Sequence, residues 1–113
     1  TKPLVGFINK CSEIKGVKDA LFTVKLGLSN VEGEKTEGFH KNNVYGTHLV
    51  GPVLVKNPHF MDYMVNLICT QKDKGFQFTR AEYKYESRAY DVTLGALTAR
   101  IPEEAGKKIN CWK

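Results

Sequence analysis

The sequence predicts an α/β fold in which about three or more strands are followed by two helices. The first half holds short, β-branched apolar runs separated by glycine-containing loops, and the second half holds apolar residues at helical spacing. A length of 113 residues, with 42% hydrophobic and 26% charged residues, is typical of one globular domain, residues 1–113. Because the helices come late, we expect an antiparallel or mixed sheet, or one portion of a larger domain.

Three apolar runs are predicted as strands, each bounded by turn-forming residues. They are Leu4–Asn9, Ala20–Leu26 and Asn43–Val50, and the last ends at Gly51-Pro52. Residues 27–38 contain three glycines and several acids, which predicts a loop.

Two segments of the second half are predicted as helices. Asn57-Pro58 is a typical helix start, so the first helix should run from Pro58 to about Thr70. Thr79 and Glu82 have the spacing of a capping box, and Pro102 should end the second helix. The polar, lysine-rich residues 103–113 are expected to form a flexible tail.

The composition argues against several classes of function. No apolar run approaches the ~18 residues of a membrane span, so no membrane association is expected. The net charge is +5, but lysines are scattered among acids, which makes nucleic acid an improbable partner. The three cysteines are far apart and lack C-x-x-C spacing, so we expect reduced thiols in a cytoplasm, with no metal site and no cofactor.

His48 is the candidate catalytic side chain. It lies near the carboxyl end of the third predicted strand, where open α/β sheets place ligand sites, although it could equally pack and bond the backbone. We expect His40 and His59 at the surface. Cys11 is the best placed thiol because it follows the first predicted strand, but no cysteine lies in a strand-to-helix elbow that would expose a nucleophile.

One continuous segment carries a family resemblance. Residues 37–58 read EGFHKNNVYGTHLVGPVLVKNP. This segment resembles the "EG…KN-x-x-GTYLHGP-x-L-x-x-NP" run of class I glutamine amidotransferase domains of the cobyric acid synthase type, including the amidotransferase subunits of lipid II isoglutaminyl synthases. Val5-Gly6-Phe7, followed by Asn9, is similar to the family's "GFENHSG" strand. The resemblance covers roughly residues 4 to 70.

The resemblance implies a three-layer α/β sandwich that releases ammonia from glutamine with a cysteine nucleophile and a histidine base. It also implies a synthetase or ligase partner, in cobyric acid-type amidation (cobalamin biosynthesis) or in cell-wall amidation. The family cysteine lies before the matched segment, so the chain is expected to be the carboxyl half of such a domain. A half-domain exposes a sheet edge and apolar surface, which predicts a homo-oligomer unless another chain covers them.

Departures from the family pattern bear on activity. The family histidine falls on Val50, and the family tyrosine falls on His48. Residues two apart in a strand lie ~6–7 Å apart, whereas a base must lie within ~3 Å of the proton it takes. A simple replacement by His48 should therefore fall short, which predicts a degenerate or partial domain without independent glutaminase activity.

Two alternatives remain open. The chain could be an active glutamine-hydrolysing half that uses His48 with a nucleophile from a missing segment, or a small basic module that binds an acidic partner. Besides His48, the candidate site consists of residues expected to contact substrate: Asn9, Lys10, Cys11, Gly46, Thr47 and Val50.

Overall fold

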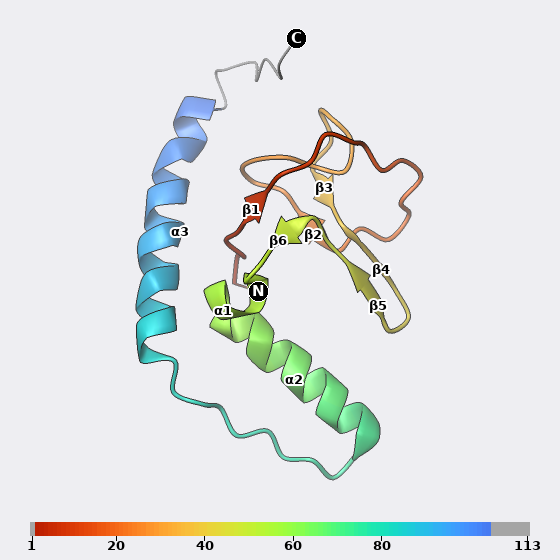
Figure 1. Ribbon diagram of the computed structural model, residues 1–113, viewed down its shortest axis with the longest axis vertical. Coiled ribbons are helices and arrows are strands. Elements are labelled where there is room, and N and C mark those ends of the chain that lie inside the picture. Colours follow the sequence, from red (N-terminus) through yellow and green to blue (C-terminus); the bar gives the residue numbers. More distant parts are fainter. Residues whose placement is uncertain (1, 105–113) are drawn as a thin grey trace. The chain divides into compact units, whose positions relative to one another are not determined.

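The computed structural model describes residues 2–104, in which antiparallel strand pairs are followed by helices (Figure 1). The predicted mixed α/β class is therefore confirmed. The chain divides into two compact units, which are described separately. One unit comprises Thr1–Gly6 and Gly51–Gly95, and the other comprises Phe7–Val50 and Ala96–Lys113.

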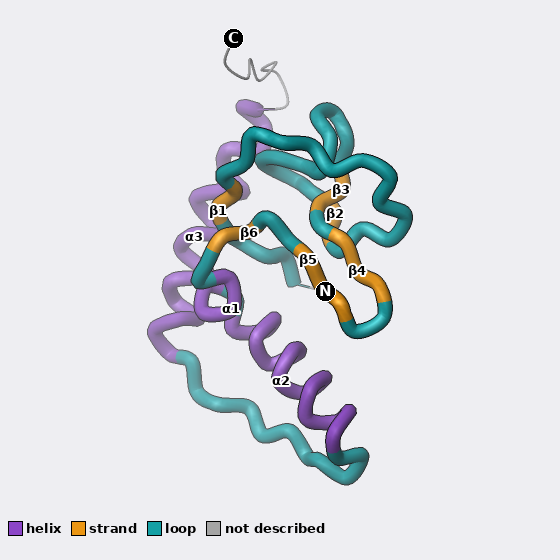
Figure 2. Tube along the Cα trace, turned by 45° about the vertical axis from the view of Figure 1, so that its right-hand side comes forward, coloured by secondary structure: helices purple, strands orange, loops and turns teal. Residues whose placement is uncertain are grey.

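The strands form three antiparallel pairs within the described part of the second unit. β1 (Phe7–Ile8) pairs with β6 (Leu49–Val50), β2 (Phe22–Thr23) with β3 (Thr36–Glu37), and β4 (Phe39–Lys41) with β5 (Val44–Gly46). Figure 2 shows them as brief segments: long loops separate β1, β2 and β3, whereas β3 to β6 follow one another through short connections. Among residues 2–104 the strand pairs are all antiparallel, which agrees with the expectation of antiparallel rather than parallel pairing.

The strands are shorter and more numerous than the sequence predicted. Only two residues of each of the first two predicted runs are paired, because the apolar pattern marks a β-prone segment but not the length of its partner. The third run is interrupted at Thr47-His48, which bond to a side chain instead of to a neighbouring strand. The predicted loop of residues 27–38 contains β3.

The hairpin of β4 and β5 depends on small residues at its base. The register places Phe39 opposite Gly46, and a Cβ atom at position 46 would overlap the Phe39 ring. Gly38 has a φ of +68°, and a Cβ atom there would overlap the carbonyl oxygen of Gly46. Glycine is thus required at position 38, which turns the chain from β3 into β4, whereas a side chain at position 46 would require the exposed Phe39 ring to rotate away.

A buried amide organises the loop before β3. The side chain of Asn30 is 1% exposed, and its amide donates to the Gly38 carbonyl at 2.9 Å while its oxygen accepts the Gly38 N–H at 2.8 Å. The ammonium of Lys10 donates to the carbonyl oxygens of Ser29 and Asn30. This part of the fold is held by polar contacts that satisfy buried backbone groups.

The helices are α1 (Val53–Lys56), α2 (Pro58–Lys72) and α3 (Lys84–Glu104). The prediction of α2 is confirmed, with Pro58 at its first position. The short α1 was not predicted. α3 begins five residues after Thr79, so the expected capping box is wrong, and it continues past Pro102, where the helix is already within its last turn. Most of the predicted tail, residues 105–113, lies outside the described residues.

Asn57 ties the amino-terminal segment to the helices within the first unit. It is 0% exposed, and its side chain accepts the Val5 N–H and donates to the Val5 and Val53 carbonyls, each at 2.8 Å. It therefore does not cap α2 with its side chain. The Tyr90 hydroxyl donates to the Pro3 carbonyl at 2.7 Å, so α3 holds the same segment.

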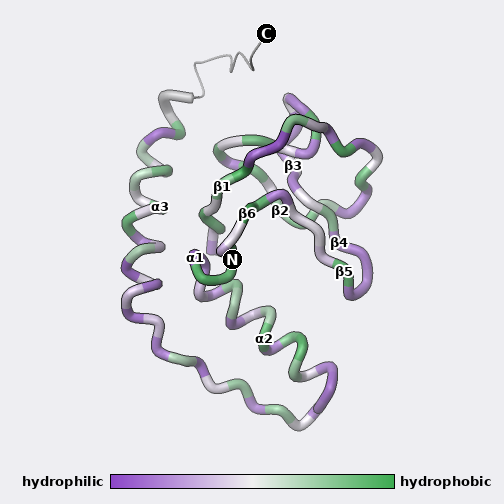
Figure 3. The backbone as a smooth tube through the Cα atoms, viewed as in Figure 1, coloured by the Kyte–Doolittle hydropathy of each residue, from purple (hydrophilic) through white to green (hydrophobic). Residues whose placement is uncertain are grey.

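Few apolar side chains are buried. Among the side chains that the structure describes, Val5 and Tyr90 are the buried hydrophobic residues. The large exposed ones are Phe7, Ile14, Phe39, Val44, Val50, Leu54, Val55, Tyr63, Val65, Ile68, Tyr85 and Val92. Figure 3 shows this apolar character along α1 and at intervals along α2. No helix within residues 2–104 is both long and apolar enough to cross a membrane.

Candidate functional site

Thr47 and His48 form the connection between β5 and β6, beside the end of β3. Glu37 is the last residue of β3, and the turn at Gly38 follows it directly. Asn30 bonds both backbone groups of Gly38, which fixes this turn and with it the position of Glu37. The site is therefore built on a backbone corner that buried hydrogen bonds define.

The carboxylate of Glu37 is the centre of this site. Its side chain is 3% exposed and accepts three hydrogen bonds from two consecutive residues. The Thr47 hydroxyl donates at 2.7 Å, the His48 backbone N–H at 2.7 Å, and the His48 Nδ1 lies 3.1 Å from Oε1. Because an ionised carboxylate only accepts hydrogen bonds, the arrangement places a proton on Nδ1.

The imidazole of His48 is held at one nitrogen and unbonded at the other. Its side chain is 22% exposed, and within residues 2–104 the ring's hydrogen bond is made through Nδ1. In the neutral ring with Nδ1 protonated, Nε2 carries the lone pair. A carboxylate bound to one nitrogen of a histidine whose other nitrogen is unprotonated is the arrangement that suits general base catalysis.

Thr47 fixes the backbone on both sides of His48. Its hydroxyl donates to Glu37 and also accepts the N–H of Leu49 at 3.1 Å. Gly46 precedes it as the last residue of β5. Three of the predicted site residues, Gly46, Thr47 and His48, thus lie in one continuous segment.

The other predicted site residues have different surroundings. Val50 ends β6 opposite Phe7, and it is 45% exposed. Asn9 and Cys11 are exposed, and Lys10 is directed to the carbonyls of Ser29 and Asn30. The structure thus gives Lys10 a structural contact, while contact of these residues with substrate stays a prediction.

Glu37 is the member of the site that the sequence analysis missed. It lies within the EG pair that opens the family-like segment, but the neighbouring Glu32 and Glu34 made it resemble one more acid of a solvated loop. Burial distinguishes it, since Glu32 and Glu34 are exposed and Glu37 is 2% exposed. The sequence signal that could have found it is the Glu37-Gly38 pair itself, which opens the family-like segment.

The other histidines make contacts of different kinds. The His40 ring stacks on Tyr45 with centroids 4.2 Å apart, and its Nε2 lies 2.7 Å from the Asn42 carbonyl oxygen. His59 packs edge-on to Tyr90 at 5.0 Å. His40 and His59 are both half-buried, so the expected surface position of each is met only in part. Burial, followed by the charge of Lys2, lowers the pKa of His59.

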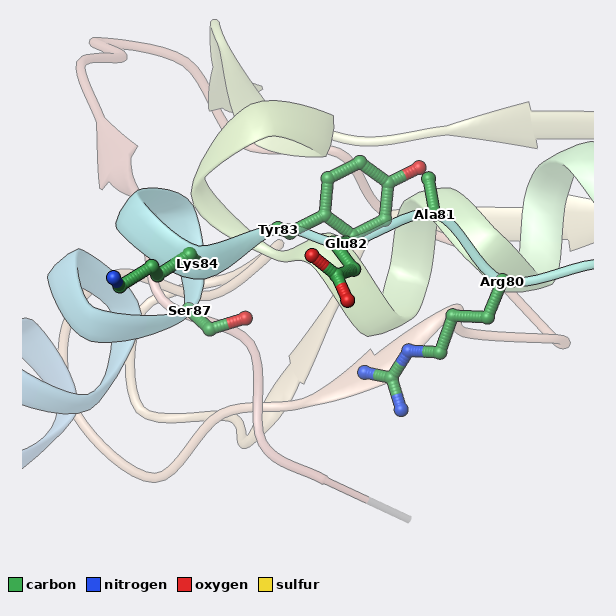
Figure 4. Close-up of a pocket in the computed structure, with 6 residues that line it drawn as sticks. All are labelled: Arg80, Ala81, Glu82, Tyr83, Lys84 and Ser87. Carbon is green, nitrogen blue, oxygen red and sulfur yellow. The ribbon is translucent and has the colours of Figure 1, made fainter.

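A hollow of about 490 Å³ lies at the start of α3, in the first unit (Figure 4). The residues that line it are Arg80, Ala81, Glu82, Tyr83, Lys84 and Ser87, none of which belongs to the predicted site. It holds charges of both signs and has no thiol or imidazole in its lining. Within residues 2–104 no cluster of side chains has the composition needed to hold a metal ion.

Comparison with known proteins gives one informative similarity. The chain is 32% identical over 91 residues to the lipid II isoglutaminyl synthase (glutamine-hydrolyzing) subunit GatD of Staphylococcus aureus (strain N315). The match covers 80% of this chain, which spans 37% of the length of that relative. No protein-family model and no solved structure matches the chain. The similarity bears out a relationship to a GatD-like amidotransferase subunit.

Proposed function

We propose that this chain is the carboxyl-terminal part of a glutamine amidotransferase-like domain that works with a ligase partner in cell-wall amidation. The observation that carries the proposal is the 32% identity to a subunit of a glutamine-hydrolysing synthase, which extends over 80% of the chain. Because that relative is named for lipid II, the similarity favours a cell-wall acceptor over a cobyric acid-type acceptor. Reduced, unpaired thiols at Cys11 and Cys69 agree with a cytoplasmic location.

The chain by itself is proposed to lack glutaminase activity. Val50, at the place of the family histidine, has an isopropyl group that cannot exchange a proton. Cys11 is exposed on a loop and Cys69 is half-buried within α2, so neither described cysteine lies in an elbow that would activate it. The domain is degenerate at position 50 and, on this proposal, depends on a segment or subunit outside the chain.

The exposed apolar surface supports the need for a partner. Phe7 and Val50 are direct cross-strand neighbours of β1 and β6, and they are 60% and 45% exposed. Adjacent exposed apolar side chains on a two-stranded pair are typical of surfaces that another element covers. We propose that the ligase partner or the rest of the domain covers them, and that a homo-oligomer forms when both are missing.

Reconstitution with the ligase subunit of a lipid II isoglutaminyl synthase tests this function. The natural full-length protein is co-purified with the ligase, and amidation of a lipid II analogue is followed by mass spectrometry with ammonium chloride as nitrogen source. We expect a stable complex and ammonium-dependent amidation, and the 113-residue chain alone should release no ammonia from glutamine. Absence of both a complex and amidation, or ammonia release by the chain alone, would overturn the proposal.

A further inference from the structure

We propose that one face of α2 is the docking surface for an amphipathic, acidic helix of the ligase partner. The face consists of Met61, Val65, Ile68 and Lys72, which are called the α2 stripe below. The inference rests on the proposed function for the identity of the partner, and it adds the surface and the kind of element that this surface fits. Its support is the spacing, the exposure and the charge of the stripe.

The spacing of the α2 stripe is that of a helix–helix contact. Its members are separated by four, three and four residues, so they follow one another along a single face of α2. Residues at alternating intervals of three and four are the pattern by which two helices pack, with the side chains of one helix filling the gaps of the other. At a rise of ~1.5 Å per residue the stripe extends for about 16 Å, which matches three turns of a partner helix.

The apolar middle of the stripe is exposed. Val65 and Ile68 are 41% and 54% exposed. A second apolar row on the same helix, formed by Phe60, Met64 and Leu67, is half-buried. α2 therefore has one apolar row that the fold covers in part and another that it leaves open. Neighbouring apolar side chains that stay exposed on a folded surface are typical of sites of protein interaction.

The charge beside the stripe favours an acidic partner. Lys56 at the end of α1 and Lys72 at the end of α2 are exposed. Asp62 is the only acid in the sequence between residues 53 and 72, and it is buried and paired with Arg80, with Oδ2 and Nε 3.0 Å apart. The exposed charges of these two helices are therefore positive. A helix with apolar residues at the spacing of the stripe and a carboxylate opposite Lys72 is complementary to this surface.

The same charge argues against a second copy of this chain on the stripe. In a two-fold contact the same surface is present on both sides of the interface. The second stripe would bring another Lys72 and no exposed acid to pair with the first. The ligase partner is therefore the occupant that the surface favours.

Binding of the natural full-length protein to the ligase subunit tests the apolar part of the surface, with Kd measured by isothermal titration calorimetry. Val65→Ala and Ile68→Ala should each raise Kd by about 10-fold, as truncation of a well-packed side chain at an interface does. Alanine also preserves the helix. Val92→Ala is the matched control, because Val92 is 67% exposed on α3 of the same unit and lies outside the stripe. It should change Kd by less than about 2-fold.

Charge reversal tests the acidic character of the partner. Lys72→Glu should raise Kd by about 10-fold at low ionic strength and by less at high ionic strength, because salt screens exposed charges. Lys84→Glu, at an exposed lysine of α3, is the control for the change in net charge and should alter Kd by less than about 2-fold. Equal effects of the two reversals would contradict a carboxylate opposite Lys72.

The remaining outcomes separate this inference from the proposed function. An unchanged Kd in Val65→Ala and Ile68→Ala would overturn the docking surface and leave the proposed function standing. If Kd is unchanged while the thermal midpoint of the protein alone falls, the stripe packs within the protein's own chain. If Kd is unchanged while Ile68→Ala converts a dimer to a monomer in sedimentation velocity, the occupant is a second copy, and either result overturns the inference. Failure of the unaltered protein both to bind the ligase and to support ammonium-driven amidation would instead reject the proposed function, and the inference with it.

Discussion

The Oε1 atom of Glu37 lies 2.7 Å from the backbone nitrogen of His48 and 3.1 Å from its ring Nδ1. One buried oxygen therefore fixes both the backbone and the side chain of the same residue. The second oxygen of Glu37 binds the Thr47 hydroxyl, so the whole connection between β5 and β6 is anchored to β3. This connection is the most highly organised part of the predicted site.

Removal of the Glu37 carboxylate should destabilise the second unit. Glu37→Ala leaves three donors of Thr47 and His48 without their buried acceptor, and we expect the free energy of unfolding to fall by about 2–3 kcal/mol. Urea denaturation of the 113-residue chain measures this change. Glu34→Ala, at an exposed acid, should alter it by less than about 0.5 kcal/mol, and equal effects of the two substitutions would contradict the assigned contacts.

Two glycines of positive φ should respond differently to alanine. Gly38→Ala adds a Cβ atom that overlaps the Gly46 carbonyl oxygen, whereas Gly33→Ala, at a φ of +86°, meets nothing within 4 Å. We expect Gly33→Ala to cost about 1–2 kcal/mol from backbone strain alone. Gly38→Ala should cost about 2 kcal/mol more, from the added overlap. Thermal denaturation of both variants tests the difference, and similar midpoints would rule out the close approach of Gly38 to Gly46.

Asn57 should be the most sensitive asparagine of the first unit. Asn57→Ala removes two buried hydrogen bonds to the Val5 backbone and one part-buried bond to the Val53 carbonyl, so we expect the free energy of unfolding to fall by about 2–4 kcal/mol. Asn66→Ala, at an exposed position of α2, is the control and should be close to neutral. Hydrogen exchange of the Val5 amide provides a direct readout. Continued protection of that amide in Asn57→Ala would contradict the bond.

Stability should decline below neutral pH because of His59. Burial, and then the charge of Lys2, lowers the pKa of His59 from its ordinary value of 6.5. The unfolded chain therefore binds the proton more readily, and the free energy of unfolding falls as the pH drops through 6.5 and approaches the folded value. His59→Gln should flatten this part of the profile in urea denaturation.

The lowered pKa of Glu13 affects the free energy of unfolding in a separate, more acidic pH range. The Glu32 backbone N–H that bonds its carboxylate favours the charged form, so this contribution to the free energy of unfolding is lost only as the pH falls below the ordinary value of 4.5.

A stability profile that is unchanged by His59→Gln near pH 6 would contradict the burial of His59.

The features that the sequence predicted well were local ones. Asn57-Pro58 and the apolar spacing that follows it are sufficient to begin α2 at Pro58, because proline fits the first turn of a helix. The lengths of the strands could not be predicted, since pairing depends on a partner that is distant in sequence. Asn57 looked like a cap, but its bonds to Val5 reach 52 residues away, which no local pattern encodes.

The candidate site was predicted in part for the same reason. His48 and Thr47 stood out because they lie in the family-like segment, and the structure places them together. Glu37 did not stand out, because its burial arises from a turn at Gly38 that Asn30 holds from a distance. The interruption of the strand at Thr47-His48 also has no local signal, since both residues are compatible with a strand.

The protonation state of the His48 ring tests the central claim most directly. Nitrogen-15 chemical shifts of the histidine side chains, recorded above neutral pH, show which ring nitrogen carries the proton. The contact with Glu37 predicts a proton on Nδ1 and a lone pair on Nε2, with a shift toward the other tautomer in Glu37→Gln. A proton on Nε2 in the unaltered protein, or a tautomer that does not respond to Glu37→Gln, would contradict the contact of the His48 ring with the buried Glu37 carboxylate.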